Sequence, residues 1–341
     1  MTKARDLADL GGVTTRLDQV GNSDGALSNR NLLINSEFRV NQRGVTSLTG
    51  NSGVSAFLAD RWLTYCNAVN WSASIQEVTL PDGTVTNSLK TVATTTSANA
   101  FFHPIQRVEA LGKDYLQGKK VVLSAWVRTN VAGQSMRICD TINCHYIGTE
   151  IPSDGDWHKV YAVHTMPTNM NTGVTNAIQF HPIFTPVTLA TNDYCEFALP
   201  QMELGSEPTP FEHRSFGDEL AKCQRYYYLK GSGTGFGSAQ SGAGAYARMY
   251  ALPERHPVEM RATPTVSFIS GGSTYFASGG GLTVGTPTGD IGTIQNSVHS
   301  LHSLNSSTTG INRLSIGNGF SFTRGQSYVV TSNFIQVDAE L

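Results

Sequence analysis

The sequence predicts an all-β protein whose strands form sandwiches of two antiparallel sheets. Its 341 residues include 34 glycines and short, dispersed apolar runs, a mixture typical of many strands joined by tight turns. Alternating apolar and polar residues recur between turn signals along most of the chain. The length is sufficient for two or three domains.

The N-terminal segment differs from the β-rich remainder. Leu7, Leu10 and Leu17 are spaced as on short helical turns, and glycines interrupt the pattern. A segment this short cannot bury a core of its own. We therefore expect residues 1–30 to form a docking arm, with Leu7, Leu10 and Leu17 as its contacts; the alternatives are an oligomer contact and a frayed terminus.

The clearest strand of the first β region is residues 120–128. Val121, Leu123, Ala125 and Val127 alternate on one face, and Trp126 lies on the other. Weaker alternation marks further strands. These strands are expected at residues 71–78, 157–165, 177–184 and 194–199, the last with Cys195 as a small core residue. Together they predict a sandwich domain over residues 31–214.

A helix is expected to follow this domain, over residues 216–230. Asp218 and Glu219 stand near its start, where they complement the helix dipole, and Gly231 closes it. We assign residues 215–230 to a linker helix. Residues 231–341 begin with a glycine-rich loop and continue as alternating segments, which predict a second, smaller β-sandwich domain.

Residues 201–212, Gln-Met-Glu-Leu-Gly-Ser-Glu-Pro-Thr-Pro-Phe-Glu, form the segment between the last strand and the helix. They are predicted to begin as the end of a buried strand. Pro208 and Pro210 then stiffen the exit, because proline fixes φ and disfavours helix before it. This segment is expected to act as the hinge between the two domains.

Composition argues against several classes of partner. The net charge is −2 and only 15% of residues are charged, so nucleic acid is not expected as a partner. No apolar run reaches about 18 residues, and the N-terminus lacks a signal-like apolar core. We expect synthesis in a cytoplasm and no membrane insertion. The five cysteines are odd in number and widely spaced, so no disulfide framework is expected.

Several short motifs occur in a characteristic order. They are residues 31–38, residues 59–62, residues 123–128, Gly155-Asp156-Trp157, residues 202–212, residues 223–227 and the closing residues 337–341. In this order they resemble bacteriophage tail-fibre and receptor-binding proteins, and residues 31–230 are also similar to carbohydrate-binding modules of the jelly-roll type. The resemblance implies a jelly-roll domain, a homotrimer, attachment to tail or capsid proteins, a location in the virion and recognition of host-surface glycan.

Four residues are candidates for glycan binding, which needs aromatic faces together with polar side chains. Trp126 could line a sheet face; alternatively it lies on the core side. Trp62 beside Asp60 and Arg61 could form a ligand edge; alternatively Arg61 pairs with a carboxylate while Trp62 packs.

The tyrosines at 226, 227 and 228 cannot all be buried on one helix, so Tyr226 and Tyr228 are predicted to meet a neighbouring subunit. No metal site is expected, because His299 and His302 have no further ligand at suitable spacing. Catalytic residues and cofactors are not expected either. Glu196, Glu203 and the other carboxylates lie in no hydrolase motif.

These observations favour a structural virion fibre protein that attaches by its N-terminus and binds host-surface glycan. The alternative is a capsid decoration fibre without a receptor role, and a glycan-degrading enzyme is a third possibility.

Overall fold

The computed structural model describes residues 29–108, 113–140, 143–169, 178–230, 254–262, 264–268 and 335–340. It also describes the backbone of short strands at residues 234–240, 248–249, 275–277, 294–296, 300–303, 314–315 and 327–330. The chain divides into two compact units, Met1–Glu219 with Leu341, and Leu220–Glu340. The predicted docking contacts Leu7, Leu10 and Leu17 lie outside the described residues.

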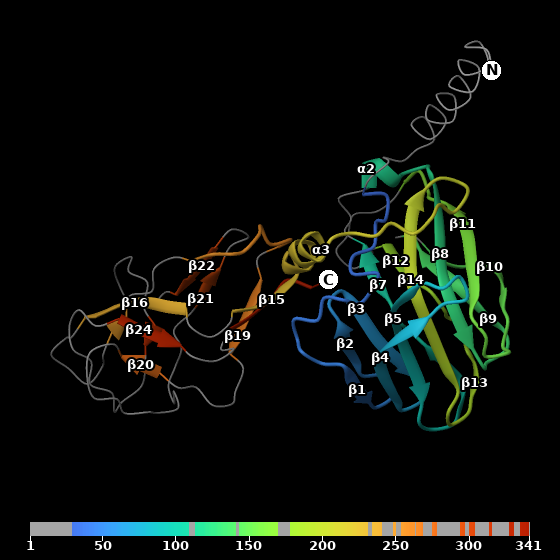
Figure 1. Ribbon diagram of the computed structural model, residues 1–341, viewed down its shortest axis with the longest axis horizontal. Coiled ribbons are helices and arrows are strands. Elements are labelled where there is room, and N and C mark those ends of the chain that lie inside the picture. Colours follow the sequence, from blue (N-terminus) through green and yellow to red (C-terminus); the bar gives the residue numbers. More distant parts are fainter. Residues whose placement is uncertain are drawn as a thin grey trace, which may run out of the picture. The chain divides into compact units, whose positions relative to one another are not determined.

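The first unit contains a six-stranded antiparallel sheet in the order β1-β4-β5-β14-β8-β11 (Figure 1). Its strands are β1 (Ser47–Gly50), β4 (Trp71–Thr79), β5 (Val85–Ala93), β14 (Tyr194–Leu204), β8 (Lys120–Thr129) and β11 (His158–Thr165). The long strand β14 lies in the middle, between β5 and β8. The expected strand at 120–128 is confirmed as β8, and the one at 194–199 continues to Leu204.

Two four-stranded sheets form the opposing layer, in the orders β10-β9-β12-β7 and β13-β6-β3-β2. Their strands are β2 (Ser55–Ala59), β3 (Trp62–Asn67), β6 (Ser97–Phe102), β7 (Gln106–Val108), β9 (Gln134–Cys139), β10 (Cys144–Ile151), β12 (Ile178–His181) and β13 (Val187–Leu189). A bridge between Leu63 and Ile105 brings the two sheets together. A short helix, α2 (Lys113–Leu116), precedes β8.

One continuous apolar core lies between the layers. The six-stranded sheet contributes Leu123 and Phe197, and the opposing layer contributes Trp62, Ile138 and Phe180, all fully buried. Side chains alternate across a strand, so each sheet turns its apolar face to this core and a more polar face outward. The first unit is therefore a β-sandwich of the jelly-roll class, which confirms the predicted fold class.

The second unit is also built from antiparallel sheets. They have the orders β15-β25-β19, β20-β24-β16-β17-β23 and β18-β22-β21. The strands are β15 (Tyr227–Lys230), β16 (Thr234–Gln240), β17 (Arg248–Met249), β18 (Glu254–Arg255), β19 (Thr265–Phe268), β20 (Tyr275–Ala277), β21 (Ile294–Asn296), β22 (Ser300–Ser303), β23 (Leu314–Ser315), β24 (Ser327–Val330) and β25 (Ile335–Asp338). Among the described residues, no helix is long and apolar enough to cross a bilayer.

The helix between the domains is shorter than predicted. Helix α3 covers Phe216–Gln224, and its first turn is capped where Ser215 Oγ accepts from the Asp218 N–H. The chain then turns, and residues 227–230 pair with β25 as a strand. The predicted helix over residues 225–230 is therefore wrong, because β-sheet pairing overrides the helical pattern there.

This change of backbone conformation also corrects the expectation for the tyrosines. Tyr226, Tyr227 and Tyr228 are all buried within the chain, at 2%, 2% and 6% exposure. The Tyr228 hydroxyl lies 2.6 Å from His256 Nδ1. The prediction of Tyr226 and Tyr228 as subunit contacts depended on a helix continuing through them. A turn followed by a strand buries all three instead.

The cysteines differ from expectation in one respect. Cys139 and Cys144 form a disulfide, although no disulfide was predicted. They are direct cross-strand partners in the β9–β10 hairpin, which brings their Cα atoms within 4.0 Å. Cys66, Cys195 and Cys223 are buried free thiols, and Cys195 is a core residue as predicted.

Candidate functional site

Trp126 lies on the outer face of the six-stranded sheet. Its neighbours in sequence, Ala125 and Val127, point into the core, so strand alternation places the indole on the opposite side. Trp126 is half-buried and pairs across the sheet with Lys159 of β11 and Ala198 of β14. The structure therefore favours a position on the sheet face over the alternative of a core tryptophan.

A β-bulge in β14 shapes the surface next to Trp126. Ala198 pairs with Trp126, but Gln201 pairs with Ser124, so β14 carries one extra residue at this point. The bulge contains Pro200, which has no N–H for the ladder, and Leu199, which has a positive φ of 49°. Leu199 consequently lies against the outer-face apolar cluster that includes Trp126.

A cavity of about 290 Å³ opens beside this bulge. Its lining residues come from the strands, from the turn after β4 and from the segment after β14. They are Asp82, Thr84, Ser124, Ala125, Trp126, Lys159, Leu199, Thr209, Pro210, Phe211 and His213. The volume lies near the lower end of small-molecule sites, which span about 300–1,000 Å³. The cavity combines two aromatic rings with hydroxyl, cationic and anionic groups.

Asp82 and Lys159 supply opposite charges to the cavity. Asp82 Oδ1 accepts a 3.0 Å hydrogen bond from the Thr84 N–H in a tight turn. This hydrogen bond lowers the pKa of Asp82, and the nearby Lys159 charge lowers it further. The carboxylate is therefore ionised at neutral pH, and it presents acceptors while Lys159 presents donors.

Hydrogen bonds to the buried side chains of Glu203 and Gln201 hold one wall of the cavity in place. Glu203, only 2% exposed, accepts hydrogen bonds from the Thr209 N–H at 2.8 Å and from the Thr209 hydroxyl at 2.6 Å. Gln201 Oε1 accepts from the Glu212 N–H at 2.9 Å. These bonds fasten residues 205–214 over the outer face, which places Phe211 against Trp126's cluster. We call this set of contacts the clasp.

The clasp extends to the first residues of the domain. Glu212 Oε2 accepts from the Asn31 N–H at 2.8 Å, and Arg30 donates to the Thr209 hydroxyl at 2.7 Å. Arg214 pairs with Glu212 and with Glu219 and donates to the Asn31 carbonyl. The predicted hinge segment and the motif that begins at Asn31 are therefore parts of one interlocked structure.

The other predicted ligand residues lie in the interior. Trp62 is fully buried; its ring contacts those of Phe38 and Phe197, and its indole N–H donates to the Asn35 carbonyl at 3.0 Å. Asp60 is fully buried, with an ion pair to Arg43 at 3.3 Å. These contacts correct the expectation of a ligand edge, because the tight β2–β3 turn directs the side chains inward.

Arg61 belongs to the same turn and is 3% exposed. Its φ is 72°, and its guanidinium donates to the Arg107 carbonyl at 2.5 Å. The contact holds the β2–β3 turn against β7. Arg61 is thus part of the turn's support and does not line a ligand edge.

The two glutamates of β14, Glu196 and Glu203, are both buried and both have partners. Glu196 accepts from the Ser88 hydroxyl at 2.5 Å and pairs with Arg128 at 2.7 Å. The Arg128 guanidinium also lies over the Trp157 ring, 4.7 Å from its centroid. Glu203 is engaged in the clasp. Both carboxylates are therefore structural in this arrangement.

A second aromatic group covers the outer face of the opposing layer. His103 and His181 stack with 4.4 Å between ring centroids, and Phe184 and Tyr65 pack around His103. Burial, together with the charges of Arg137 and Arg107, lowers the pKa of His103 to about 3. Burial likewise lowers the pKa of His181 well below its usual value. These rings were not predicted, because their positions in sequence show no shared pattern.

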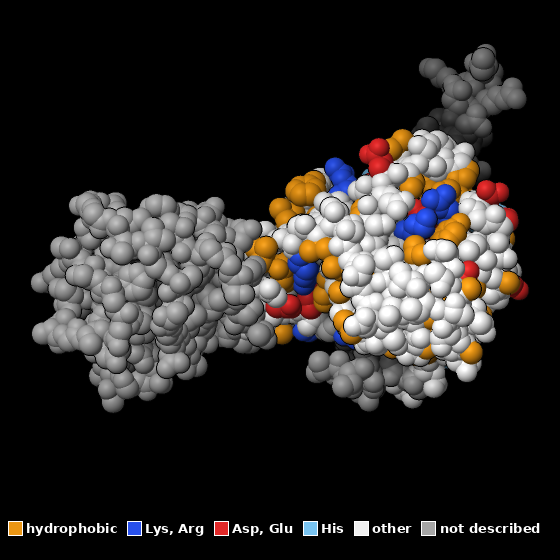
Figure 2. Space-filling model, turned by 90° about the horizontal axis from the view of Figure 1, so that it is seen from below, with side chains coloured by type: hydrophobic (Ala, Val, Ile, Leu, Met, Phe, Trp, Pro, Cys, Tyr) orange, Lys and Arg blue, Asp and Glu red, His pale blue; other side chains and the backbone are white. Residues whose placement is uncertain are grey.

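On the face of the first unit seen in Figure 2, hydrophobic, basic and acidic side chains occupy small patches, and several of these adjoin one another. This matches the low charge content of the sequence. Asp82, Lys159 and His213 were also not predicted as site residues. Trp126 belongs to the motif at 123–128 and Phe211 to the motif at 202–212, so these two motifs were the signals in the sequence that pointed to the cavity wall.

Comparisons with known proteins identify no family. No protein-family profile and no curated protein sequence matches the chain. Among solved structures, the chain is similar to TmCBM61 in complex with beta-1,4-galactotriose, at 14% identity over 52% of this chain and 100% of that chain, with a TM-score of 0.32. It is similar to the CBM22-1–CBM22-2 tandem of Paenibacillus barcinonensis Xyn10C, at 11% identity over 93% and 98% of the two chains, with a TM-score of 0.31.

A third similar structure is the CBM22-1–GH10 part of Clostridium thermocellum xylanase 10B complexed with xylohexaose. The identity is 15% over 50% of this chain, with a TM-score of 0.30, and the match spans 30% of the xylanase chain.

Proposed function

We propose that the first unit binds glycan in the cavity beside Trp126. The observation that carries this proposal is the meeting of two aromatic rings, Trp126 and Phe211, with Asp82 and Lys159 in one cavity of about 290 Å³. Sugars present C–H groups on their ring faces and hydroxyls around their edges. Aromatic rings and fixed polar groups satisfy these two kinds of surface.

Each lining group has a role in this proposal. The Trp126 and Phe211 rings cover a sugar face, Asp82 accepts from sugar hydroxyls, and Lys159 donates to sugar oxygens. The hydroxyls of Ser124 and Thr84 add groups that both donate and accept. The bulge and the clasp hold these groups in position before binding, which lowers the entropic cost of association.

We propose binding without cleavage. Glycoside hydrolysis uses two carboxyl groups on either side of the scissile bond. Among the described lining residues, Asp82 supplies the one carboxylate. Glu196 and Glu203 are held by structural partners elsewhere on the sheet.

We further propose that the protein is a virion fibre that recognises host-surface glycan. The support is the ordered set of motifs, and in particular the two that meet in the clasp, residues 31–38 and 202–212. In this proposal residues 1–30 attach the chain to tail or capsid proteins. A homotrimer would carry three cavities, so weak binding at each would be strengthened by multivalency.

Binding is tested with a glycan array probed by the purified full chain, followed by calorimetry on the best-bound oligosaccharide. We expect binding that Trp126→Ala abolishes on the array. A chain that binds no arrayed glycan even when displayed in multiple copies, but labels capsids in micrographs, would favour a decoration role instead. Release of reducing ends from host polysaccharide would contradict binding without cleavage.

The virion role is tested by deleting residues 1–28, which keeps Arg30 and its bond to Thr209 in the clasp. We expect the truncated chain to fold and bind glycan but not to join particles. Normal incorporation of the truncated chain would refute the docking role.

A further inference from the structure

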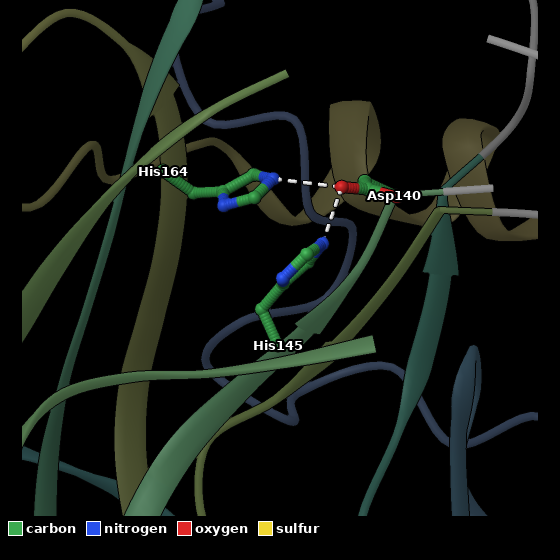
Figure 3. Close-up of side chains that lie close together, drawn as sticks. All are labelled: Asp140, His145 and His164. Atoms are coloured by element: carbon green, nitrogen blue, oxygen red, sulfur yellow. Dashed lines mark hydrogen bonds and ion pairs between the residues drawn. The ribbon is translucent and has the colours of Figure 1, made fainter. Parts of the chain in front are cut away.

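Three potential metal ligands meet at one edge of the first sandwich. The Nε2 atoms of His145 and His164 lie 2.8 Å and 3.0 Å from the same atom, Asp140 Oδ2 (Figure 3). All three ligand atoms lie within 4.8 Å of one another. Figure 3 shows both imidazole rings directing a nitrogen at the carboxylate.

The β9–β10 hairpin holds two of these residues. Asp140 follows Cys139 and His145 follows Cys144, and the disulfide joins these two cysteines. The Asn143 N–H donates to Asp140 Oδ1 at 3.0 Å, and the Asp140 N–H donates to the Asn143 carbonyl at 3.0 Å. The carboxylate is thus oriented through Oδ1 while Oδ2 faces the histidines, as supporting hydrogen bonds orient ligands in metal sites.

The third residue comes from the other layer of the sandwich. His164 lies on β11, the edge strand of the six-stranded sheet, and β10 is the edge strand of the opposing sheet. These two strands lie beside each other (Figure 1). The side chain of Asp140 is 5% exposed, that of His164 is 12% exposed and that of His145 is 40% exposed. The group is therefore enclosed on the protein side and open through His145.

The chemistry of these donors selects a class of metal. Two imidazoles and one carboxylate suit zinc and related first-row transition metals better than magnesium or calcium, which prefer oxygen ligands. Zinc binds nitrogen and oxygen at about 2.0–2.2 Å, so tetrahedral ligands lie about 3.3–3.5 Å apart. The two histidine nitrogens lie 2.8 Å and 3.0 Å from Asp140 Oδ2, so each would move away from the carboxylate by roughly half an ångström to admit the ion.

We propose that Asp140, His145 and His164 form a binding site for a divalent transition metal of the zinc class. Asp140 Oδ2 and the two Nε2 atoms would be the ligands, with each histidine proton on Nδ1. A fourth position on the exposed side would hold water. The metal would join the two layers at the β10–β11 edge, independently of the proposed glycan cavity.

The chain provides a matched control for this site. His158, also on β11, lies 3.0 Å from both carboxylate oxygens of Asp154. Within the described part of the chain, this histidine–carboxylate pair has no third metal-ligating side chain beside it. If a histidine–carboxylate pair were sufficient to bind the metal, His158→Ala would weaken metal binding as much as His164→Ala does.

The experiment uses the tag-free full chain, stripped with chelator, and titrates Zn²⁺ by calorimetry; Co²⁺ absorption reports the ligand geometry. We expect one ion per chain. His145→Ala and His164→Gln should each weaken binding by at least about 100-fold, since each removes a ligand. His158→Ala should leave the affinity unchanged. Zn²⁺ should raise the midpoint of thermal unfolding of the wild type and not that of His145→Ala.

The disulfide provides a second, independent readout. Joint Cys139→Ser and Cys144→Ser substitution leaves all three ligands in place but loosens the hairpin, and we expect about tenfold weaker binding. The proposal is overturned if the stripped wild type takes up no stoichiometric Zn²⁺ at micromolar concentration. It is also overturned if uptake persists unchanged in both His145→Ala and His164→Gln.

Discussion

Acidification should destabilise the first unit through its stacked pair of buried histidines. His103 and His181 lie 4.4 Å apart between ring centroids, and neither His103 Nε2 nor His181 Nδ1 has a hydrogen-bond partner among the described residues. Burial and the charge of Arg137 both disfavour their protonated forms. A proton added to either of these ring nitrogens would find no hydrogen-bond acceptor, and it would place a positive charge near the guanidinium of Arg137.

The direction and size of the effect follow from proton linkage. The folded pKa of His103 is about 3, below the unfolded value near 6.5, so the unfolded state binds more protons between these values. The contribution of neutral His103 to the free energy of unfolding is therefore complete above pH 6.5, and it is lost as the pH falls toward 3. Each pH unit in this window removes up to about 1.4 kcal/mol per histidine, so His103 alone loses about 2–3 kcal/mol by pH 4.5.

Urea unfolding followed by tryptophan fluorescence measures this effect selectively, because all four tryptophans of the chain lie in the first unit. His103→Phe keeps an aromatic ring among Phe184 and Tyr65 but cannot titrate. We expect it to reduce the loss of stability between pH 7 and pH 4.5 by about 2 kcal/mol. His158→Gln, at a half-buried histidine of β11, is the control. Equal pH dependence in wild type and His103→Phe would refute the argument.

Three further predictions concern the core, the clasp and the hairpin. Trp62→Ala should lower the free energy of unfolding by about 3–5 kcal/mol, because removal of the fully buried ring leaves a cavity beside Phe38 and Phe197. A loss below about 1 kcal/mol in urea unfolding would contradict the burial of Trp62. Glu203→Ala should lower the free energy of unfolding by about 1–3 kcal/mol, since the Thr209 N–H and hydroxyl lose their acceptor. It should also make residues 205–214 susceptible to limited proteolysis. Wild-type protease resistance of this segment would count against the clasp. Cys139→Ser should lower the free energy of unfolding by about 2 kcal/mol, because the disulfide closes a short loop. Wild-type protein that unfolds identically with and without reductant would argue against this contribution.

Much of the first unit was predictable from local pattern. Alternation along β8 predicted which side chains face the core and placed Trp126 on the other side, since a strand exposes successive residues to opposite faces. The same reasoning found β14 and the core position of Cys195. Local pattern was sufficient here because burial of one sheet face imposes a strict period on the sequence.

Features that depend on pairing between distant segments were not predictable. Asp140 and His145 meet His164 only because a hairpin of one sheet lies beside the edge strand of another. The Trp126 cavity depends on one extra residue in β14. Neither the pairing nor the bulge leaves a periodic signal.

The overlong helix prediction has a related cause. Residues 225–230 are compatible with a helix by local propensity, yet residues 225 and 226 form a turn and residues 227–230 pair with β25, more than 100 residues later in the sequence. The ligand edge expected at Asp60, Arg61 and Trp62 is not found, because a tight turn with a positive φ at Arg61 directs these side chains inward; for Trp62 the alternative of packing holds. Tertiary contacts decided both cases.

The central claim is that glycan binds beside Trp126, and the measurement that tests it most directly compares two aromatic substitutions. Trp126→Ala alters the cavity, while Tyr146→Ala removes a 54%-exposed ring from β10 of the opposing layer. Calorimetric titration with the best-bound array oligosaccharide should show at least about tenfold weaker binding for Trp126→Ala, equivalent to about 1.4 kcal/mol, and wild-type affinity for Tyr146→Ala. Wild-type affinity in Trp126→Ala, or a loss confined to Tyr146→Ala, would contradict the claim.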